Sequence, residues 1–140
     1  MSLTFPSLDF FRALQQQTKD QAAEFERLGY CDTTFGIRVD QELFTIAFEI
    51  YECVDVMEGG DPGKLDFVLS APRELWCEML ASIQESQGAD AAHTINSLTH
   101  LGDAIKVEYD DPEGHDRFYR FMVTIQAFFD EAQFLDLESN

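Results

Sequence analysis

The side chains best suited to proton transfer or metal binding at neutral pH are the three histidines, His93, His100 and His115. None of them belongs to an H-E-x-x-H or H-x-H pattern, in which two imidazoles can share one metal ion. His100 lies three residues before Asp103, and a carboxylate at that spacing can orient an imidazole. General acid–base catalysis needs further positioned partners, and the sequence identifies none. We therefore interpret this pair as a helix-end histidine beside a solvated acid, and we predict no catalytic residue, no metal site and no cofactor.

Two loops have compositions that superficially suggest ion or phosphate binding. Asp110, Asp111 and Glu113 form an oxygen-rich turn, but the D-x-[DN]-x-[DN]-G pattern and the distal glutamate of a calcium-binding EF-hand are missing. The glycine cluster at 59–63 lacks the Lys-Ser/Thr ending of a phosphate-binding loop. We predict a polar turn at the first position and a hairpin turn at the second.

The cysteines, Cys31, Cys53 and Cys77, are odd in number and form no C-x-x-C pair. A disulfide framework and a zinc knuckle both fit this pattern poorly, which favours a reducing, cytoplasmic environment. Cys77 follows Trp76 on an expected apolar helix, so we interpret it as a packing residue and not as a reactive thiolate. The sequence also lacks the G-x-S-x-G pattern of a serine nucleophile.

The charge of the chain excludes several classes of partner. Its 27 acidic and 9 basic residues give a formal net charge of −18, which repels nucleic acids and anionic lipid headgroups. No apolar run approaches the ~18 residues of a membrane span, and we expect neither a signal peptide nor stable membrane insertion. The strong field leaves a basic protein partner open as an alternative to a simply well-solvated surface.

The first half of the chain changes from a helical to a strand-like period. One helix face is expected before the stop at Gly29, formed by Leu8, Phe11, Leu14, Ala22, Phe25 and Leu28. Alternating apolar residues then predict a strand around 35–39, and a second strand whose inner face carries Phe44, Ile46, Phe48 and Ile50. The second run continues to Val56, and residues 65–69 give a further strand after the glycine cluster.

The second half alternates helices with one more strand. A helix is predicted to start at Ser70-Ala71-Pro72, and a weaker helix spans about 91–101. Ile105, Val107 and Tyr109 alternate as a strand, and the last helix runs from about Asp116 to Phe134. Consecutive strands with short links predict a single domain over 1–140, an α+β fold whose mainly antiparallel sheet has helices packed on one face.

The aromatic surplus is the strongest remaining signal, because the chain contains 13 phenylalanines. A dense core is the commoner use of such residues, and the alternative is an apolar tunnel between the helices and the sheet. The tunnel hypothesis assigns its wall to thirteen residues: Phe44, Phe48, Phe67, Trp76, Met79, Leu80, Leu98, Ile105, Phe118, Phe121, Met122, Ile125 and Phe129.

Two stretches resemble the sterol carrier protein 2 family. The segment 65–76, Leu-Asp-Phe-Val-Leu-Ser-Ala-Pro-Arg-Glu-Leu-Trp, is similar to the family's strand with an aspartate, serine-containing cap and apolar helix. The segment 102–108 is similar to its Gly-Lys-Leu-Lys-Ile strand, and the helix from Phe118 to Phe129 takes the place of its terminal amphipathic helix. The chain departs from the family in Tyr109-Asp110-Asp111, where a glycine is usual, in its acidity, and in ending without a peroxisomal Ser-Lys-Leu address.

The resemblance implies a five-stranded sheet over an apolar tunnel that binds fatty acyl chains, sterols or similar lipids without catalysis. The residues themselves indicate four strands plainly, and we place the fifth at 52–57. An isomerase or dehydratase of the nuclear transport factor 2-like type is an alternative, although that fold places several helices before its main strands. A protein-interaction or accessory subunit, including a homodimer, is the other alternative, in which the apolar stripes form an interface.

Overall fold

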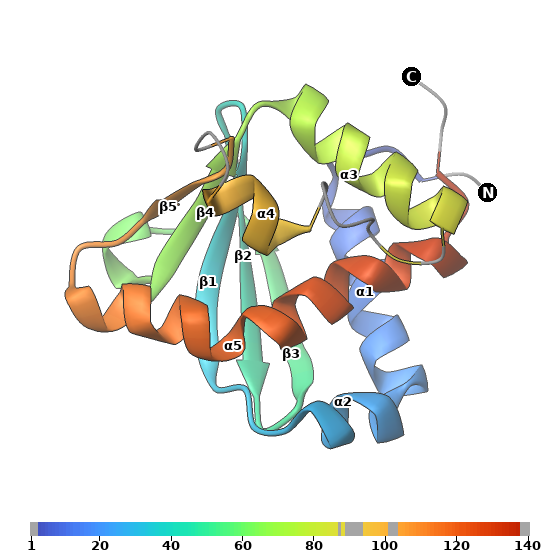
Figure 1. Cartoon of the computed structure of the whole chain (residues 1–140), viewed down its shortest axis with the longest axis horizontal. Coiled ribbons are helices and arrows are strands. Elements are labelled where there is room, and N and C mark those ends of the chain that lie inside the picture. The colour runs from blue at the N-terminus through green and yellow to red at the C-terminus, as the bar shows by residue number, and fades with distance from the viewer. Residues whose placement is uncertain (1–2, 87, 89–93, 101–103, 138–140) are drawn as a thin grey trace.

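The computed structural model of the chain describes residues 3–86, 88, 94–100 and 104–137. Its sheet contains five strands: β1 (Thr33–Val39), β2 (Glu42–Glu49), β3 (Glu52–Glu58), β4 (Phe67–Ala71) and β5 (Lys106–Glu108). The strand order is β3-β2-β1-β4-β5, and only the β1–β4 pair is parallel (Figure 1). This confirms the mainly antiparallel five-stranded sheet, and β3 is the fifth strand expected at 52–57.

Five α-helices and two short 3₁₀ segments complete the described structure. They are α1 (Leu8–Asp20), α2 (Ala22–Leu28), η1 (Pro62–Lys64), α3 (Arg73–Ser86), α4 (Ile95–His100), α5 (Pro112–Asp130) and η2 (Glu131–Phe134). In Figure 1 the long helix α5 crosses the sheet, with α1 and α3 beside its C-terminal part and the short α4 near β5.

The helices cover one face of the sheet, as predicted, and the contact layer is largely phenylalanine. The inner residues of β1 and β2 alternate with less buried ones because successive side chains of a strand point to opposite faces. Phe11 of α1 contacts Phe44, while Phe128 and Phe118 of α5 contact Phe48 and Phe67 respectively. The indole N–H of Trp76 on α3 donates to the carbonyl oxygen of Arg38 at 3.1 Å. These contacts join three helices to the sheet in one buried aromatic layer.

The turn predicted at 59–63 is not a hairpin. β3 lies at one edge of the sheet, whereas β4 pairs with β1 on the other side, so this segment is a crossover connection. Leu65, at the end of the connection, and Leu43 of β2 meet over Gly36, where a side chain would press against both. The predicted strand at 65–69 lies at Phe67–Ala71, and α3 accordingly begins at Arg73 and not at Ser70.

The N-terminal helix predicted from Leu8 to Leu28 is two helices. Gln21 departs from helical geometry with φ −108° and ψ 33°, and α2 begins directly after it. As a result Ala22 and Leu28 are exposed, while Phe25 reaches the core. Ile50 was also expected on the inner face of a strand, but it occupies the tight β2–β3 turn with φ +60° and is exposed.

The last helix starts four residues earlier than its apolar pattern indicates. Asp111 caps it, accepting a hydrogen bond from the backbone N–H of Glu113 at 2.9 Å, and Pro112 occupies the first turn. The predicted polar turn is therefore mainly a helix start. The weaker helix expected at 91–101 is α4, and the predicted positions 91–93 and 101 lie outside the described residues.

Candidate ligand-binding site

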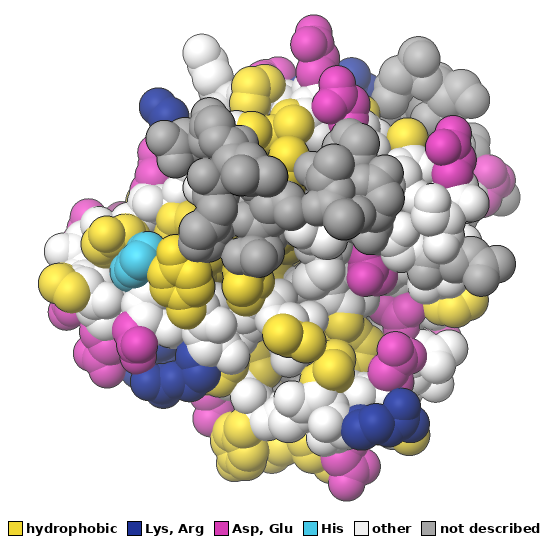
Figure 2. Space-filling view, viewed as in Figure 1, with side chains coloured by type: hydrophobic (Ala, Val, Ile, Leu, Met, Phe, Trp, Pro, Cys, Tyr) yellow, Lys and Arg dark blue, Asp and Glu magenta, His cyan; other side chains and the backbone are white. Residues whose placement is uncertain are grey.

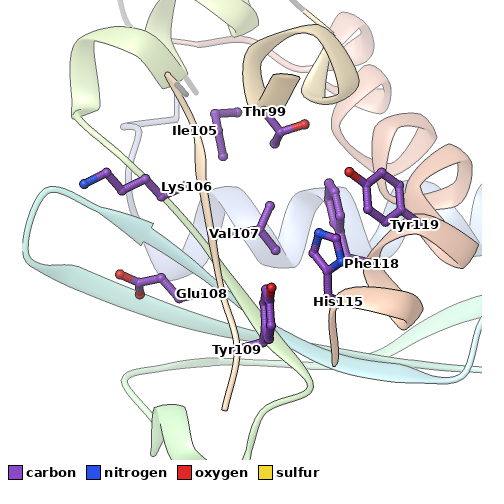
Figure 3. Close-up of a pocket in the computed structure, with 9 residues that line it drawn as sticks. All are labelled: Thr99, Ile105, Lys106, Val107, Glu108, Tyr109, His115, Phe118 and Tyr119. Atoms are coloured by element: carbon purple, nitrogen blue, oxygen red, sulfur yellow. The ribbon is translucent and has the colours of Figure 1, made fainter. Parts of the chain in front are cut away.

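A hollow of about 530 Å³ lies between β5, α4 and the N-terminal half of α5. Nine residues line it: Thr99, Ile105, Lys106, Val107, Glu108, Tyr109, His115, Phe118 and Tyr119. Figure 3 shows the side chains of Val107 and Ile105 on the same side of β5 as Phe118, His115 and Tyr119 of α5. The wall on this side is therefore mainly aliphatic and aromatic.

The alternation of β5 separates the apolar wall from the charged rim. Lys106 and Glu108 project to the opposite side of the strand from Val107 (Figure 3). Glu108 forms an ion pair with Arg38 of β1 across the face that the helices leave open. Ile105 is buried and Val107 half-buried, because both face the helices.

The aromatic side chains of the hollow contact one another in a continuous series. The ring centroids of Tyr109 and His115 lie 4.9 Å apart, and those of His115 and Tyr119 lie 4.7 Å apart with their planes at 88°. Tyr119 also contacts Phe118, at 5.4 Å. Phe118 is fully buried and packs edge-on against Phe67 of β4 at 5.5 Å, so the series continues into the core. The two tyrosines are 45% and 43% exposed and form the outer part of the wall.

Asp66, just before β4, fixes the N-terminal half of α5 against the sheet. Its Oδ2 accepts hydrogen bonds from Thr33 Oγ1 at 2.7 Å and from the N–H of Thr34 at 3.2 Å. The same oxygen lies 3.3 Å from Nη1 of Arg117 on α5. Gly114 packs so closely on the carbonyl oxygen of Asp66 that an added methyl group would overlap it. The first turns of α5, which carry His115, are therefore held at a fixed distance from β4.

The arginines on the N-terminal half of α5 are paired with carboxylates. Arg117 pairs with Glu113 as well as Asp66, and Arg120 pairs with Asp116 at 2.6 Å. Among the ion pairs of the part of the chain that the structure describes, none involves Asp110 or Asp111, which directly follow Tyr109. In Figure 2 hydrophobic side chains and a histidine gather beside acidic groups on this part of the surface.

Twelve of the thirteen residues predicted to line a tunnel lie in the buried core. These are Phe44, Phe48, Phe67, Trp76, Met79, Leu80, Leu98, Ile105, Phe118, Phe121, Ile125 and Phe129, and the thirteenth, Met122, is half-buried. Ile105 and Phe118 also line the hollow beside β5. Trp76 stacks on Phe129 with centroids 5.5 Å apart, and Phe35 stacks on Phe67 at 5.3 Å. At these positions the aromatic surplus packs against itself.

Met122 lines a second, shallower hollow of about 440 Å³ between α2 and α5. Its other lining residues are Glu24, Leu28, Thr94, Val123, Gln126, Ala127 and Asp130. Val123 is 64% exposed, so the outer side of α5 leaves apolar surface in contact with solvent. This hollow lies on the far side of α5 from the sheet and does not join the aromatic layer.

The thirteen residues assigned to the tunnel wall do not include Val107, Tyr109, His115 or Tyr119, which line the hollow. Their signal was present in part, because His115 and Tyr119 are four residues apart on one helix and Val107 and Tyr109 alternate on one extended segment. What the sequence lacked was the placement of β5 beside α5. His93, Asp103 and the side chain of His100 lie outside the described residues, so the predicted histidine–acid pair stays a prediction.

Cys31, Cys53 and Cys77 form no disulfide with one another, and the two buried thiols, Cys31 and Cys53, are poor thiolates. Burial raises the pKa of the Cys31 thiol to about 12, with a further contribution from Asp32. Burial also raises the pKa of Cys53 to about 12. Cys77 is half-buried on α3.

In the described ranges no group of three or more histidine, cysteine or acidic side chains is arranged to hold a metal ion. No helix in those ranges is long and apolar enough to cross a membrane.

One buried carboxyl group lies outside the hollow, at the C-terminal end of α5. Glu131 is 4% exposed, and its Oε1 has no hydrogen-bond partner among the described residues. Burial, together with the negative charges of Glu24 and Asp130, raises its pKa to about 7. This group affects stability, as considered below, and does not touch the candidate site.

The architecture is that of an α+β protein with a hollow, lined by aromatic, aliphatic and polar side chains, between one edge of its sheet and its longest helix. Two solved structures share the fold. The crystal structure of sterol carrier protein 2 superposes with a TM-score of 0.66 at 11% identity, covering 92% of this chain and 97% of that one. The solution structure of a conserved hypothetical protein from Thermus thermophilus, described as possibly a sterol carrier protein, gives a TM-score of 0.59, also at 11% identity, with 96% and 91% covered.

No protein-family model and no curated protein matches the chain. At 11% identity the structural likeness shows the fold alone. The resemblance inferred from the two sequence segments is confirmed at that level, because the shared fold covers nearly the whole chain.

Proposed function

We propose that this chain binds an apolar small molecule, without chemically changing it, in the hollow between β5, α4 and α5. The observation that carries the proposal is a hollow of about 530 Å³ whose inner wall is formed by Ile105, Val107, Phe118 and the rings beside them. Small-molecule sites typically measure ~300–1,000 Å³ and have mainly apolar and aromatic walls with a few polar groups.

The position of the hollow supports an apolar ligand. Phe118 belongs both to the wall and to the buried layer, where it packs against Phe67. A ligand group that covers half-buried Val107 and the exposed rings of Tyr109 and Tyr119 would remove apolar surface from water beside the core, at ~25 cal/mol per Å². The fold shared with a sterol carrier protein favours the same class of ligand.

The proposal keeps the sequence-predicted tunnel in a reduced form. Ile105 and Phe118 border the ligand, ten of the other predicted residues form the packed layer that supports this wall, and Met122 lines the separate hollow beside α2. The groups that complete the site, Val107, Tyr109, His115 and Tyr119, supply aromatic faces and polar edges. This division assigns ligand contact to the N-terminal half of α5 and structural support to its C-terminal half.

The test fills the hollow with a side chain. Val107→Trp places a large ring against Phe118, and we expect it to weaken binding of N-phenyl-1-naphthylamine, a neutral apolar dye, at least about tenfold by removing the space for the ligand. Fluorescence titration of the purified chain measures the binding. Val54→Trp is the matched control, because Val54 is a 38% exposed valine on β3, at the other edge of the sheet.

Chemical-shift mapping gives a second readout that does not depend on the folding of the variant. Titrating the dye into the unaltered protein should shift the amide signals of Ile105, Val107 and Phe118 more than those of α1. Saturable binding that leaves these three signals unchanged would contradict the site. Failure of this dye, a long-chain alcohol and a fatty acid to bind the folded protein would contradict the function itself.

A further inference from the structure

We infer that the hollow selects amphiphiles with a quaternary ammonium head. This inference rests on the proposed binding function and names the class of ligand. The aromatic series Tyr109, His115 and Tyr119 forms the outer wall, while the apolar residues form the inner wall. A ligand that matches both parts has an apolar chain and a head that binds to aromatic faces.

The geometry of the rings suits a cation without N–H donors. His115 and Tyr119 lie with their planes at 88°, Tyr109 is tilted by 38° from His115, and all three residues line the same hollow. Figure 3 shows Tyr109 and Tyr119 on different sides of His115, all beside the hollow. A cation within about 6 Å of a ring face is attracted by its electron-rich surface, and quaternary ammonium groups are bound in this way because they cannot donate hydrogen bonds.

The charges around the hollow also favour a cation. Asp110 and Asp111 follow Tyr109 directly, line a neighbouring depression and not the hollow itself, and take part in none of the ion pairs of the described residues. The chain as a whole carries −18. Among the described lining residues, the charged side chains of Lys106 and Glu108 both project away from the rings (Figure 3), and Glu108 is paired with Arg38. Arg117 and Arg120 are each paired with carboxylates. A carboxylate or phosphate head would therefore meet repulsion without a facing basic group.

The experiment compares two esters that differ only in charge. Decanoylcholine carries a trimethylammonium head, and 3,3-dimethylbutyl decanoate replaces that nitrogen with carbon at nearly the same shape. We expect decanoylcholine to bind about tenfold more tightly in displacement of N-phenyl-1-naphthylamine, since partly desolvated cation–π contacts together amount to about one factor of ten. Decanoate, with a negative head, should bind more weakly than either ester.

A variant separates the rings from the general field of the protein. Tyr109→Leu combined with Tyr119→Leu keeps every charge and an apolar wall, and should reduce the preference for decanoylcholine below about threefold while changing the affinity for the neutral ester less than about twofold. Tyr30→Leu is the matched control, because Tyr30 is 68% exposed and follows α2. The ring contribution should also persist at high salt, where the field of exposed charges is screened.

The outcomes separate this inference from the function on which it rests. Equal affinity for the two esters would overturn the preference for an ammonium head and leave the proposed apolar site in place. If the double tyrosine variant still prefers decanoylcholine, the preference arises from the net charge of the protein, and the role of the rings is overturned. Failure of both esters and the dye to bind would overturn the proposed function, and the head-group inference with it.

Discussion

The two halves of α5 carry similar aromatic side chains in different environments. In the C-terminal half, Phe128 and Phe129 are fully buried, at 5.4 Å from Phe48 and 5.5 Å from Trp76 between ring centroids. In the N-terminal half, His115 and Tyr119 border a hollow, and Tyr119 is 43% exposed. Both halves belong to one uninterrupted helix of 19 residues.

The difference arises from what covers each half. α3, with 14 residues, and α1, with 13, pack beside the C-terminal half and the segment that follows it. The N-terminal half faces β5, which has three residues, and α4, which has six. Elements this short supply too few side chains to fill the space beside a helix about 28 Å long. A packed core and a hollow can therefore occupy successive turns of the same helix.

Truncation in the packed half should produce the largest effect on stability. Phe129→Ala removes a ring that stacks on Trp76, and we expect a loss of about 3–5 kcal/mol in the free energy of unfolding. Phe134→Ala is the control. Phe134 is 56% exposed, so its truncation should change the free energy of unfolding little. Denaturant unfolding measures both variants, and a loss below about 1 kcal/mol for Phe129→Ala would show that this half is not a packed core.

Ile125 lies in the C-terminal half of α5, one turn beyond its middle. It is fully buried, so Ile125→Ala should cost about 2–5 kcal/mol without ligand and leave the stabilisation added by ligand unchanged. Thermal melts with and without decanoylcholine distinguish the alternatives. If Ile125→Ala keeps wild-type stability but loses the stabilisation that the ligand adds, the binding site lies further along α5, in the predicted tunnel.

A methyl group at Gly114 should disturb the half that borders the hollow. It would overlap the carbonyl oxygen of Asp66, and the first turn of α5 would have to move away from β4. We expect Gly114→Ala to cost about 1–3 kcal/mol and to weaken dye binding more than about tenfold, because His115 moves with that turn. Gly63→Ala is the control, since the nearest atom to a methyl group there lies at 3.4 Å. Unchanged dye binding by Gly114→Ala would show that the hollow does not depend on the contact between Gly114 and Asp66.

Glu131, just beyond the packed half, should make stability depend on pH. Its pKa is raised from 4.5 to about 7 in the folded chain, so its protonated form is favoured there. The folded state then holds more protons than the unfolded state, and the contribution is full below about pH 4.5 and lost as pH rises through 7.

The variant Glu131→Gln removes this titration. Between about pH 5 and pH 8 we expect the wild type to lose about 1–2 kcal/mol of unfolding free energy relative to the variant, less than the full shift implies because the carboxylate can partly rehydrate. Glu85→Gln on exposed α3 surface is the control. Parallel stability curves for wild type and Glu131→Gln would contradict the raised pKa.

The sequence determined the order of elements and the inner face of the sheet. Phe35, Ile37 and Val39 alternate with polar or small residues, and a period of two is decisive when one face of a strand is buried. The helical spacing that ends at Phe129 likewise identified the buried side of α5. Element boundaries were less accurate, because Pro112 and Asp111 start a helix by capping and not by apolar periodicity.

Tertiary structure alone decided which aromatic residues are core and which border a hollow. Tyr119 and Phe129 are both aromatic residues on the same helix, and their local sequence gives no reason to separate them, yet Tyr119 is 43% exposed beside the hollow and Phe129 is fully buried. The separation follows from the crossover that places β4 beside β1, which leaves β5 as a short edge strand next to His115 and Tyr119. Hydrophobic periodicity reports which side of an element is buried, whereas the space left between two elements depends on the length and position of both, and those are set only when the whole chain packs.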